Sequence, residues 1–128
     1  MTKVGEHITL DIIGTTKEYD PSVFEKIINE IAEAANVTIL NVSKYKFEPQ
    51  GFTILALLAE SHISFHTFPE KGIISFDFFT CGNISPSVAF NIVKKHLNIK
   101  ELLKKNLIET QNHFIMIFIA HQVYKNLT

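Results

Sequence analysis

Hydrophobic residues recur along this chain in two rhythms, one typical of strands and one typical of helices. The segment His7 to Gly14 is rich in β-branched residues and predicts a strand. Asp20 and Pro21 have the residue types of a helix start, with Asp20 as the cap and Pro21 at the first helical position. The apolar residues that follow at helical spacing predict a helix over 21–35: Val23, Phe24, Ile27, Ile28, Ile31 and Ala35.

Four further apolar segments have the length and composition of strands. They are predicted over 37–47, 52–59, 61–68 and 73–79, with turns at 49–51 and 70–72. The run 52–59 is almost unbroken in its apolar character, which is typical of a central strand. Both faces of the 73–79 segment read as apolar.

The C-terminal third adds a second helix and less regular segments. Ser85 and Pro86 repeat the cap-then-proline signal, and a helix is predicted over 86–97. Segment 100–109 fits either a strand or a helix, and 113–124 is too apolar for a free tail. We therefore expect an α+β fold, a two-layer α/β sandwich whose largely antiparallel sheet is covered on one face by two helices.

Composition narrows the function classes. The chain has 128 residues, is 46% hydrophobic and carries a formal net charge of −1, which indicates one domain over 1–128 and argues against a nucleic-acid partner. A single cysteine indicates an intracellular protein. Met1 to Glu6 lacks the apolar core of a signal peptide, and the longest apolar run, 114–120, is too short to span a membrane. A cytoplasmic protein without a membrane partner is expected.

The segment from Glu60 to Glu70 concentrates reactive groups in an apolar context. It holds three hydroxyls, two imidazoles and two carboxylates. Ser61, preceded by a carboxylate and followed by imidazoles, could be an activated nucleophile, although most serines in such a place simply end a strand. A Ser-His-Asp hydrolase fits poorly, because the nucleophile elbow is absent and Asp77 is the only aspartate downstream.

The two histidines and the cysteine leave several alternatives open. In a strand, His62, Ser64 and His66 share one face, with Thr80 or Cys81 within reach from an adjacent strand. A metal held by His62, His66 and either Glu70 or Cys81 is conceivable, but such spacing suits a helix better, and we expect no metal. Cys81 is either a buried hydrophobe or a proton donor at the end of a strand.

Taken together, these residues resemble the bacterial and archaeal type of S-adenosylmethionine decarboxylase, a small pyruvoyl-dependent enzyme of polyamine synthesis. The similarity is greatest in the block from Ala59 to Glu70 and in Phe78 to Gly82. Weaker similarity runs from Gly5 through the first predicted helix, at 47–51 and at Ser85-Pro86, so that about residues 5–108 are covered. Residues 112–128 look like a C-terminal extension.

The resemblance implies a self-processing enzyme. The bond between Glu60 and Ser61 would be cut through an N-to-O acyl shift and elimination, and Ser61 would become a pyruvoyl group that forms a Schiff base with the substrate. The resemblance also implies that His66 and Thr53 assist processing and that Cys81 reprotonates the substrate. Phe47 and Phe68 would hold the adenine ring, and Glu70 would bind the substrate. Family members assemble as dimers of the αβ unit, so a homodimer is expected.

The chain departs from the family pattern on the side expected to bind the substrate. Phe68 stands where tryptophan is common, Thr53 stands for a serine, and Lys71 and Ile73 replace aromatic residues. The resemblance still implies decarboxylation of S-adenosylmethionine to the aminopropyl donor for spermidine synthesis. One alternative is the same pyruvoyl chemistry on ornithine or arginine. A second alternative is an unprocessed homologue that binds a ligand or regulates a partner.

Overall fold

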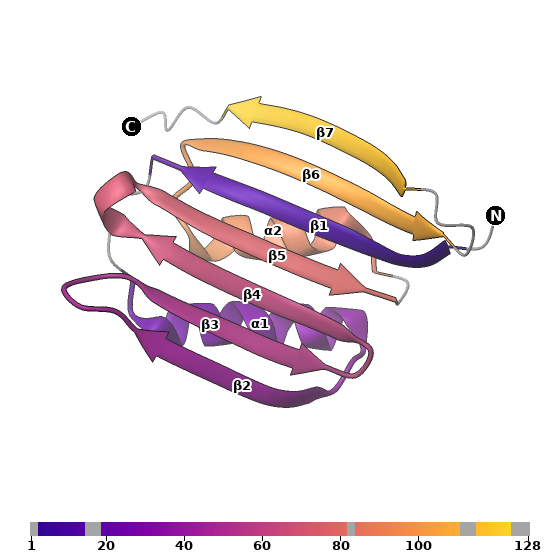
Figure 1. The fold of residues 1–128 in the computed structure, drawn as a ribbon, viewed down its shortest axis with the longest axis horizontal. Coiled ribbons are helices and arrows are strands. Elements are labelled where there is room, and N and C mark those ends of the chain that lie inside the picture. Colours follow the sequence, from indigo (N-terminus) through magenta and orange to yellow (C-terminus); the bar gives the residue numbers. More distant parts are fainter. Residues whose placement is uncertain (1–2, 15–18, 82–83, 111–114, 124–128) are drawn as a thin grey trace.

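Seven strands form one sheet in which every neighbouring pair runs antiparallel. The computed structural model describes residues 3–14, 19–81, 84–110 and 115–123. The spatial order is β2-β3-β4-β5-β1-β6-β7, and both helices lie behind the sheet in Figure 1. The elements are β1 (Lys3–Ile13), α1 (Pro21–Ala35), β2 (Ile39–Lys46), β3 (Phe52–Leu58), β4 (Ser61–Phe68), a 3₁₀ helix (Pro69–Lys71), β5 (Ile73–Thr80), α2 (Pro86–His96), β6 (Glu101–Thr110) and β7 (Ile115–Val123).

Capping groups fix where α1 begins and ends. The backbone N–H of Ser22 donates to a carboxylate oxygen of Asp20 at 2.9 Å, which satisfies one of the free donors of the first turn. Asn36 takes a left-handed conformation, with φ of 56°, and ends the helix. Ser85 caps α2 in the same way as Asp20 caps α1, through its side chain and the N–H of Ser87. No helix among the described residues is both long enough and apolar enough to cross a membrane.

The core lies between the two helices and one face of the sheet. Alternate residues of the central strands point into it, and the side chains of α1 meet them there. The opposite face, which we call the open face, has no helix over it in Figure 1. The largest fully buried side chains are Phe24, Phe65, Phe76, Phe78, Ile8, Leu10, Ile12, Ile27, Ile28, Ile31, Ile54 and Leu58.

The predicted fold class is confirmed, and several local predictions are corrected. Segment 52–59, predicted to be a central strand, is β3 and lies second from the edge of the sheet. The edge strand on that side is β2, whose residues are almost all exposed. The 70–72 turn is the end of a 3₁₀ helix. Segment 100–109, which fitted either type, is strand β6, and the apolar segment after it pairs with β6 as β7. The start of the predicted extension, residues 112–114, lies outside the described residues.

The prediction that both faces of 73–79 are apolar is wrong for the open face. Burial alternates along β5, and only the helix-facing residues are fully buried. Ser75 and Asp77 occupy the open face of this strand. The sheet therefore carries polar side chains of β5 on the side that the helices do not cover.

Candidate functional site

Strand β4 carries reactive side chains at both of its ends. Ser61 is its first residue, and His66 lies five residues further, a distance of roughly 17 Å along an extended strand. The two residues also have opposite parity in the strand, so that their side chains point to opposite faces of the sheet. A single chain therefore separates the predicted nucleophile from the predicted processing histidine.

His66 lines a cavity of about 320 Å³ at the C-terminal end of β4. Its Nδ1 lies 2.8 Å from the hydroxyl oxygen of Thr53, which is its direct partner across the β3–β4 ladder. When the Thr53 hydroxyl donates to Nδ1, the neutral ring carries its proton on Nε2. The other residues that line the cavity are Phe47, Gln50, Thr67, Phe68 and Glu70.

The hairpin between β2 and β3 brings Phe47 to this cavity. The backbone N–H of Phe47 donates to the carbonyl of Gly51 at 2.8 Å, which closes the loop. Gly51 has a φ of 89°, and a Cβ added there would lie 2.9 Å from the carbonyl oxygen of Thr67, so a larger residue would push the loop away from β4. The position of Phe47 beside this cavity thus depends on a glycine.

Both phenylalanines keep large exposed surfaces. Phe47 is 47% exposed and Phe68 is 38% exposed, and both line the same cavity. The Nζ of Lys71 lies 5.6 Å from the centre of the Phe68 ring, which is within the range of a cation–π contact. Phe68 and Lys71, which both differ from the family pattern, thus contact each other, and Lys71 places a positive charge beside the Phe68 ring.

The other end of β4 begins with a strained residue. Glu60 has a φ of 61°, a left-handed conformation that costs a non-glycine residue about 1–2 kcal/mol. It precedes Ser61 in the tight connection between β3 and β4, where Leu58 pairs with Ser61. Ser61 is only 7% exposed. The predicted scissile bond therefore joins a strained residue to a shielded hydroxyl.

Cys81 lies at this same end of the sheet. The β4–β5 register pairs His62 with Phe79, which places the residue after β5 beyond the first residue of β4. Cys81 is exposed and forms no disulfide. The prediction that Thr80 or Cys81 is reachable from Ser64 and His66 is wrong, because Thr80 is buried on the helix-covered side and Cys81 lies at the far end. Gly82 lies outside the described residues.

The structure thus sorts the predicted site residues into two groups. The first group surrounds the 320 Å³ cavity and consists of Phe47, Thr53, His66, Phe68 and Glu70. The second group lies at the other end of β4 and consists of Glu60, Ser61 and Cys81. Each group holds part of the predicted chemistry, and neither holds all of it.

A third cluster, which the sequence did not reveal, lies on the open face between them. Asp77 contacts the Nε2 atoms of both His7 and His62, each through a different carboxylate oxygen. His7 is in β1, far from β4 in the sequence, and no spacing rule links the two. The pairing of His62 with His66 and Glu70 or Cys81 as metal ligands is not found among the described residues, since His62 turns to Asp77 instead.

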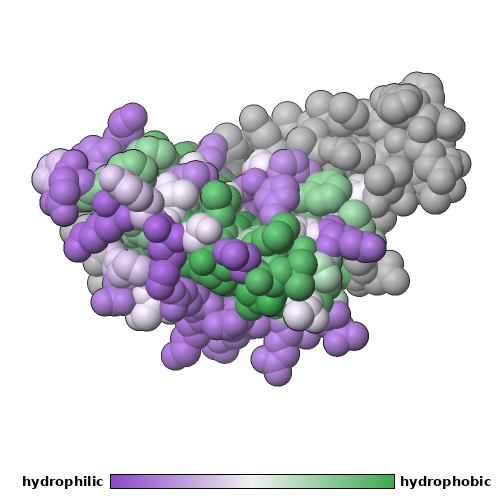
Figure 2. Space-filling view, turned by 60° about the horizontal axis from the view of Figure 1, so that its bottom comes forward, coloured by the Kyte–Doolittle hydropathy of each residue, from purple (hydrophilic) through white to green (hydrophobic). Residues whose placement is uncertain are grey.

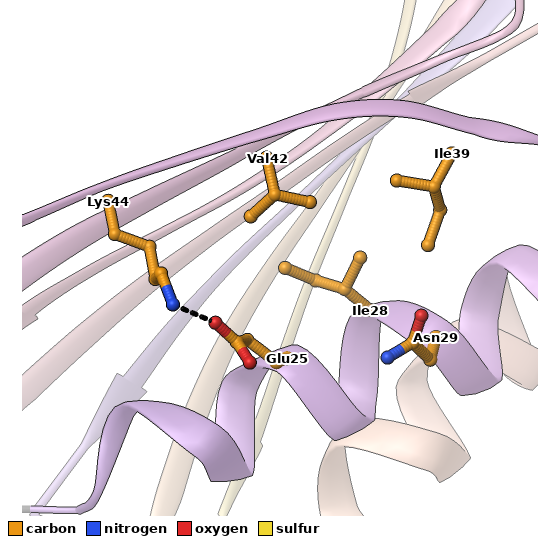
Figure 3. Close-up of a pocket in the computed structure, with 6 residues that line it drawn as sticks. All are labelled: Glu25, Ile28, Asn29, Ile39, Val42 and Lys44. Carbon is orange, nitrogen blue, oxygen red and sulfur yellow. Dashed lines mark hydrogen bonds and ion pairs between the residues drawn. The ribbon is translucent and has the colours of Figure 1, made fainter.

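A cavity of about 290 Å³ also opens between α1 and β2, away from these groups. An ion pair between Lys44 and Glu25 lies beside it, as Figure 3 shows. Among the described residues, its lining contains no imidazole, hydroxyl or thiol, the groups on which the predicted chemistry depends. The residues that line it are Glu25, Ile28, Asn29, Ile39, Val42 and Lys44.

Apolar side chains are exposed around the β2 edge and on the open face. Figure 2 shows such side chains gathered on the side of the molecule that carries the edge strand β2. On β3, Leu55 is 47% exposed and Leu57 is 54% exposed, and both alternate with the buried residues of that strand. Exposed leucines next to His62 and His66 on the open face are typical of a surface that meets another protein.

The chain is similar to known decarboxylases along most of its length. The family described as S-adenosylmethionine decarboxylase matches residues 6–108. An S-adenosylmethionine decarboxylase proenzyme of Brevibacillus brevis is 36% identical over 107 residues, covering 81% of this chain and 80% of that protein. The corresponding proenzyme of Methanococcus maripaludis is 35% identical over 116 residues, covering 85% and 95%.

A solved structure is similar as well. The crystal structure of the adenosylmethionine decarboxylase from Aquifex aeolicus superposes with a TM-score of 0.68 at 32% sequence identity. The match covers 83% of this chain and 90% of the other. Strand β7 lies outside the range that the family matches, 6–108.

Proposed function

The chain belongs to the S-adenosylmethionine decarboxylase family, and we propose that it cuts itself between Glu60 and Ser61 and then decarboxylates S-adenosylmethionine to the aminopropyl donor of polyamine synthesis. The observation that carries the proposal is the left-handed conformation of Glu60 directly before a shielded serine. Strain of this kind collects at functional sites. The relatives' description as proenzymes supports the same cleavage.

Cleavage follows from the chemistry of a serine next to a peptide carbonyl. The Oγ of Ser61 attacks the carbonyl carbon of Glu60, and the peptide nitrogen leaves, which converts the amide to an ester. Loss of the Cα proton of Ser61 then expels Glu60 as a carboxylate and leaves a Cα–Cβ double bond. Water adds at Cα and ammonia leaves. The products are a chain of residues 1–60 and a chain of residues 61–128 that begins with a pyruvoyl group.

A pyruvoyl group supplies a carbonyl that bonds to the α-amine of the substrate and draws electrons toward itself as CO₂ departs. The residues at this end fit such a group, because Ser61 is shielded at the first position of β4 while the Cys81 thiol nearby is exposed. The role of Cys81 is to return a proton to the α-carbon after CO₂ has left. Its sulfur lies at the end of the sheet where Ser61 begins β4.

The cavity at the other end of β4 binds the substrate in this proposal. Phe47 and Phe68, both partly exposed, offer aromatic rings that suit a flat base such as adenine. Glu70 places a carboxylate on the rim for the hydroxyls or the cation of the substrate. His66, oriented by Thr53, moves protons during cleavage.

These two groups of residues form one site only if two chains combine. We propose a homodimer in which Ser61 and Cys81 of one chain meet the His66 cavity of its partner. Two observations support this arrangement: the separation of roughly 17 Å within one chain, and the exposed leucines of the open face. A two-fold interface is self-complementary, so it would create two such sites at once.

Mass spectrometry and a CO₂ assay test the proposal together. We expect the purified chain to separate into fragments 1–60 and 61–128, and the Ser61→Ala variant to remain a single chain. Release of CO₂ from S-adenosylmethionine should exceed release from ornithine or arginine by orders of magnitude. Activity on ornithine or arginine alone would assign a different substrate, and a persistent uncut chain would favour a binding protein.

A further inference from the structure

His7, His62 and Asp77 form a compact group of ligand-type side chains on the open face. Their ligand atoms all lie within 4.8 Å of one another. They come from three neighbouring strands, since β5 lies between β4 and β1 in the sheet. The register places His7 and His62 on either side of Phe79, and Asp77 lies two residues from Phe79 on the same face.

Packing fixes the direction of both imidazole rings. The His62 ring stacks on Phe79 at a centroid distance of 5.9 Å, and the His7 ring meets the same phenylalanine edge-on at 5.9 Å. The two imidazole centroids are 5.8 Å apart. A shared aromatic platform therefore turns both rings toward one carboxylate.

The carboxylate lies between the two imidazoles. His62 Nε2 lies 3.1 Å from one oxygen of Asp77, and His7 Nε2 contacts the other oxygen. Ser64 donates to the same oxygen as His62 at 3.4 Å, which helps to hold the carboxylate in place. In the single chain, 26% of the His7 side chain, 43% of His62 and 31% of Asp77 is exposed, so the three ligand side chains lie at the surface that the proposed dimer would cover.

From this geometry we infer that His7, His62 and Asp77 form a binding site for a divalent transition-metal ion, with zinc as the best match. Two imidazoles and one carboxylate are the ligand set of open zinc sites, with bonds of about 2.0–2.2 Å and ligand atoms roughly 3.3 Å apart. A small rearrangement of the three side chains reaches those distances. The fourth position remains open to water. Imidazole ligands favour zinc, copper, iron and nickel over magnesium and calcium.

The ion would connect three strands and, after cleavage, the two fragments. His7 belongs to residues 1–60, whereas His62 and Asp77 belong to residues 61–128. The bridging of fragments rests on the proposed self-cleavage, but the metal site itself does not. Because His62 directly follows Ser61, the ion would also hold the first residues of β4 in place.

Metal titration of the uncut Ser61→Ala chain tests the site independently of cleavage. After dialysis against a chelator, the protein is titrated with Zn²⁺, Co²⁺ and Mg²⁺ by calorimetry, and Co²⁺ binding is followed by its visible absorption. We expect one Zn²⁺ or Co²⁺ per chain, a raised Tm and no saturable Mg²⁺ binding. His7→Gln, His62→Gln and Asp77→Asn should each weaken binding at least tenfold, because even the outer partners of metal ligands contribute about 10–100-fold.

His96→Gln is the matched control, since it removes an imidazole that bonds to Glu30 between the two helices. It should leave the metal stoichiometry and affinity unchanged. The absence of stoichiometric binding, or binding that all three ligand variants retain, would overturn the inference. If one ligand variant fails to fold, the other two variants and the Co²⁺ spectrum of the parent chain still show whether these side chains bind the ion. In the cleaved protein, Zn²⁺ should raise the urea concentration at which the two fragments separate.

Discussion

The hydroxyl of Thr53 lies 2.8 Å from Nδ1 of His66, across a directly paired position of β3 and β4. This contact determines which ring nitrogen of His66 is held by the neighbouring strand. A proton carrier works only in the correct tautomer and orientation. Thr53 is therefore placed to orient the His66 ring, as the proposed function requires.

Thr53→Val should slow self-cleavage by about tenfold, which corresponds to the ~1.4 kcal/mol expected for one lost hydrogen bond. Valine keeps the branched shape, so the change isolates the hydroxyl. Thr53→Ser restores the hydroxyl and should restore the rate. The rate is measured by gel from newly purified precursor over a range of pH, because a tautomer effect also alters the pH profile. Equal rates in the threonine and valine chains would remove Thr53 from the processing step.

Cys81→Ala should separate cleavage from turnover. The thiol takes no part in the acyl shift, so fragments 1–60 and 61–128 should still form. Loss of the proton donor should lower kcat by roughly 10²–10⁴-fold with little change in KM. Both quantities come from CO₂ release and the fragment ratio of the same sample. Unchanged turnover in a fully cleaved Cys81→Ala protein would exclude the proton-donor role.

Complementation between two inactive variants tests the shared site. Ser61→Ala damages the Ser61 and Cys81 part of the shared site, and His66→Ala damages the cavity part. A dimer with one chain of each variant therefore contains one intact site. Co-expression should restore up to about a quarter of the native sites, because half of randomly paired dimers are mixed and each has one good site of two. Ser61→Ala with Cys81→Ala is the matched control. Both changes lie in the Ser61 and Cys81 part of the shared site, so no dimer has an intact site and no activity should return.

The sequence predicted most of the fold because its signals were local. Asp20-Pro21 and Ser85-Pro86 mark helix starts through capping chemistry that acts within one turn. The strand Ser61–Phe68 was predicted with its observed bounds. The position of β3 second from the edge was not predictable, because strand order depends on pairing between distant segments and not on the apolar character of one segment.

The sequence named candidate site residues but did not give their arrangement. The resemblance identified His66 and Ser61, and strand parity alone places them on opposite faces. The contact of Asp77 with both His7 and His62 had no local signal, since it arises from the order of β1, β5 and β4. Sequence indicates which groups are present, whereas sheet order decides which of them meet.

Glu60→Gly should stabilise the uncut precursor. Glycine adopts a positive φ without the steric cost of about 1–2 kcal/mol that glutamate bears, and the extra freedom that glycine gives the unfolded chain offsets about 0.4–1 kcal/mol of that gain. The measurement is urea unfolding of the Ser61→Ala chain with and without the change. Ala59→Gly is the control, since Ala59 is not among the positive-φ residues and glycine there should destabilise. A lower stability for Glu60→Gly would show that the turn is not strained.

The contact between Glu30 and His96 should make the packing of α1 on α2 depend on pH. The hydrogen bond from His96 is the largest cause that lowers the pKa of Glu30 below its ordinary value of 4.5, and Lys95 acts in the same direction. A carboxyl whose pKa is lower in the folded state stabilises the fold above its unfolded pKa. That contribution is lost as the pH falls through the folded pKa, that is, below 4.5.

Glu30→Gln should therefore lower Tm at pH 7 and reduce the loss of stability between pH 5 and pH 3 relative to the parent chain. The effect should be small, because the pair is partly exposed and the charges are screened. Tm is measured by calorimetry or circular dichroism at each pH, in the Ser61→Ala background to avoid cleavage during heating. Glu25→Gln is the control. It also removes a carboxylate from α1, but the partner of Glu25 is Lys44 in β2 and not a residue of α2. Parallel pH curves for Glu30→Gln and the parent would show that the link between the helices does not depend on the charge of Glu30.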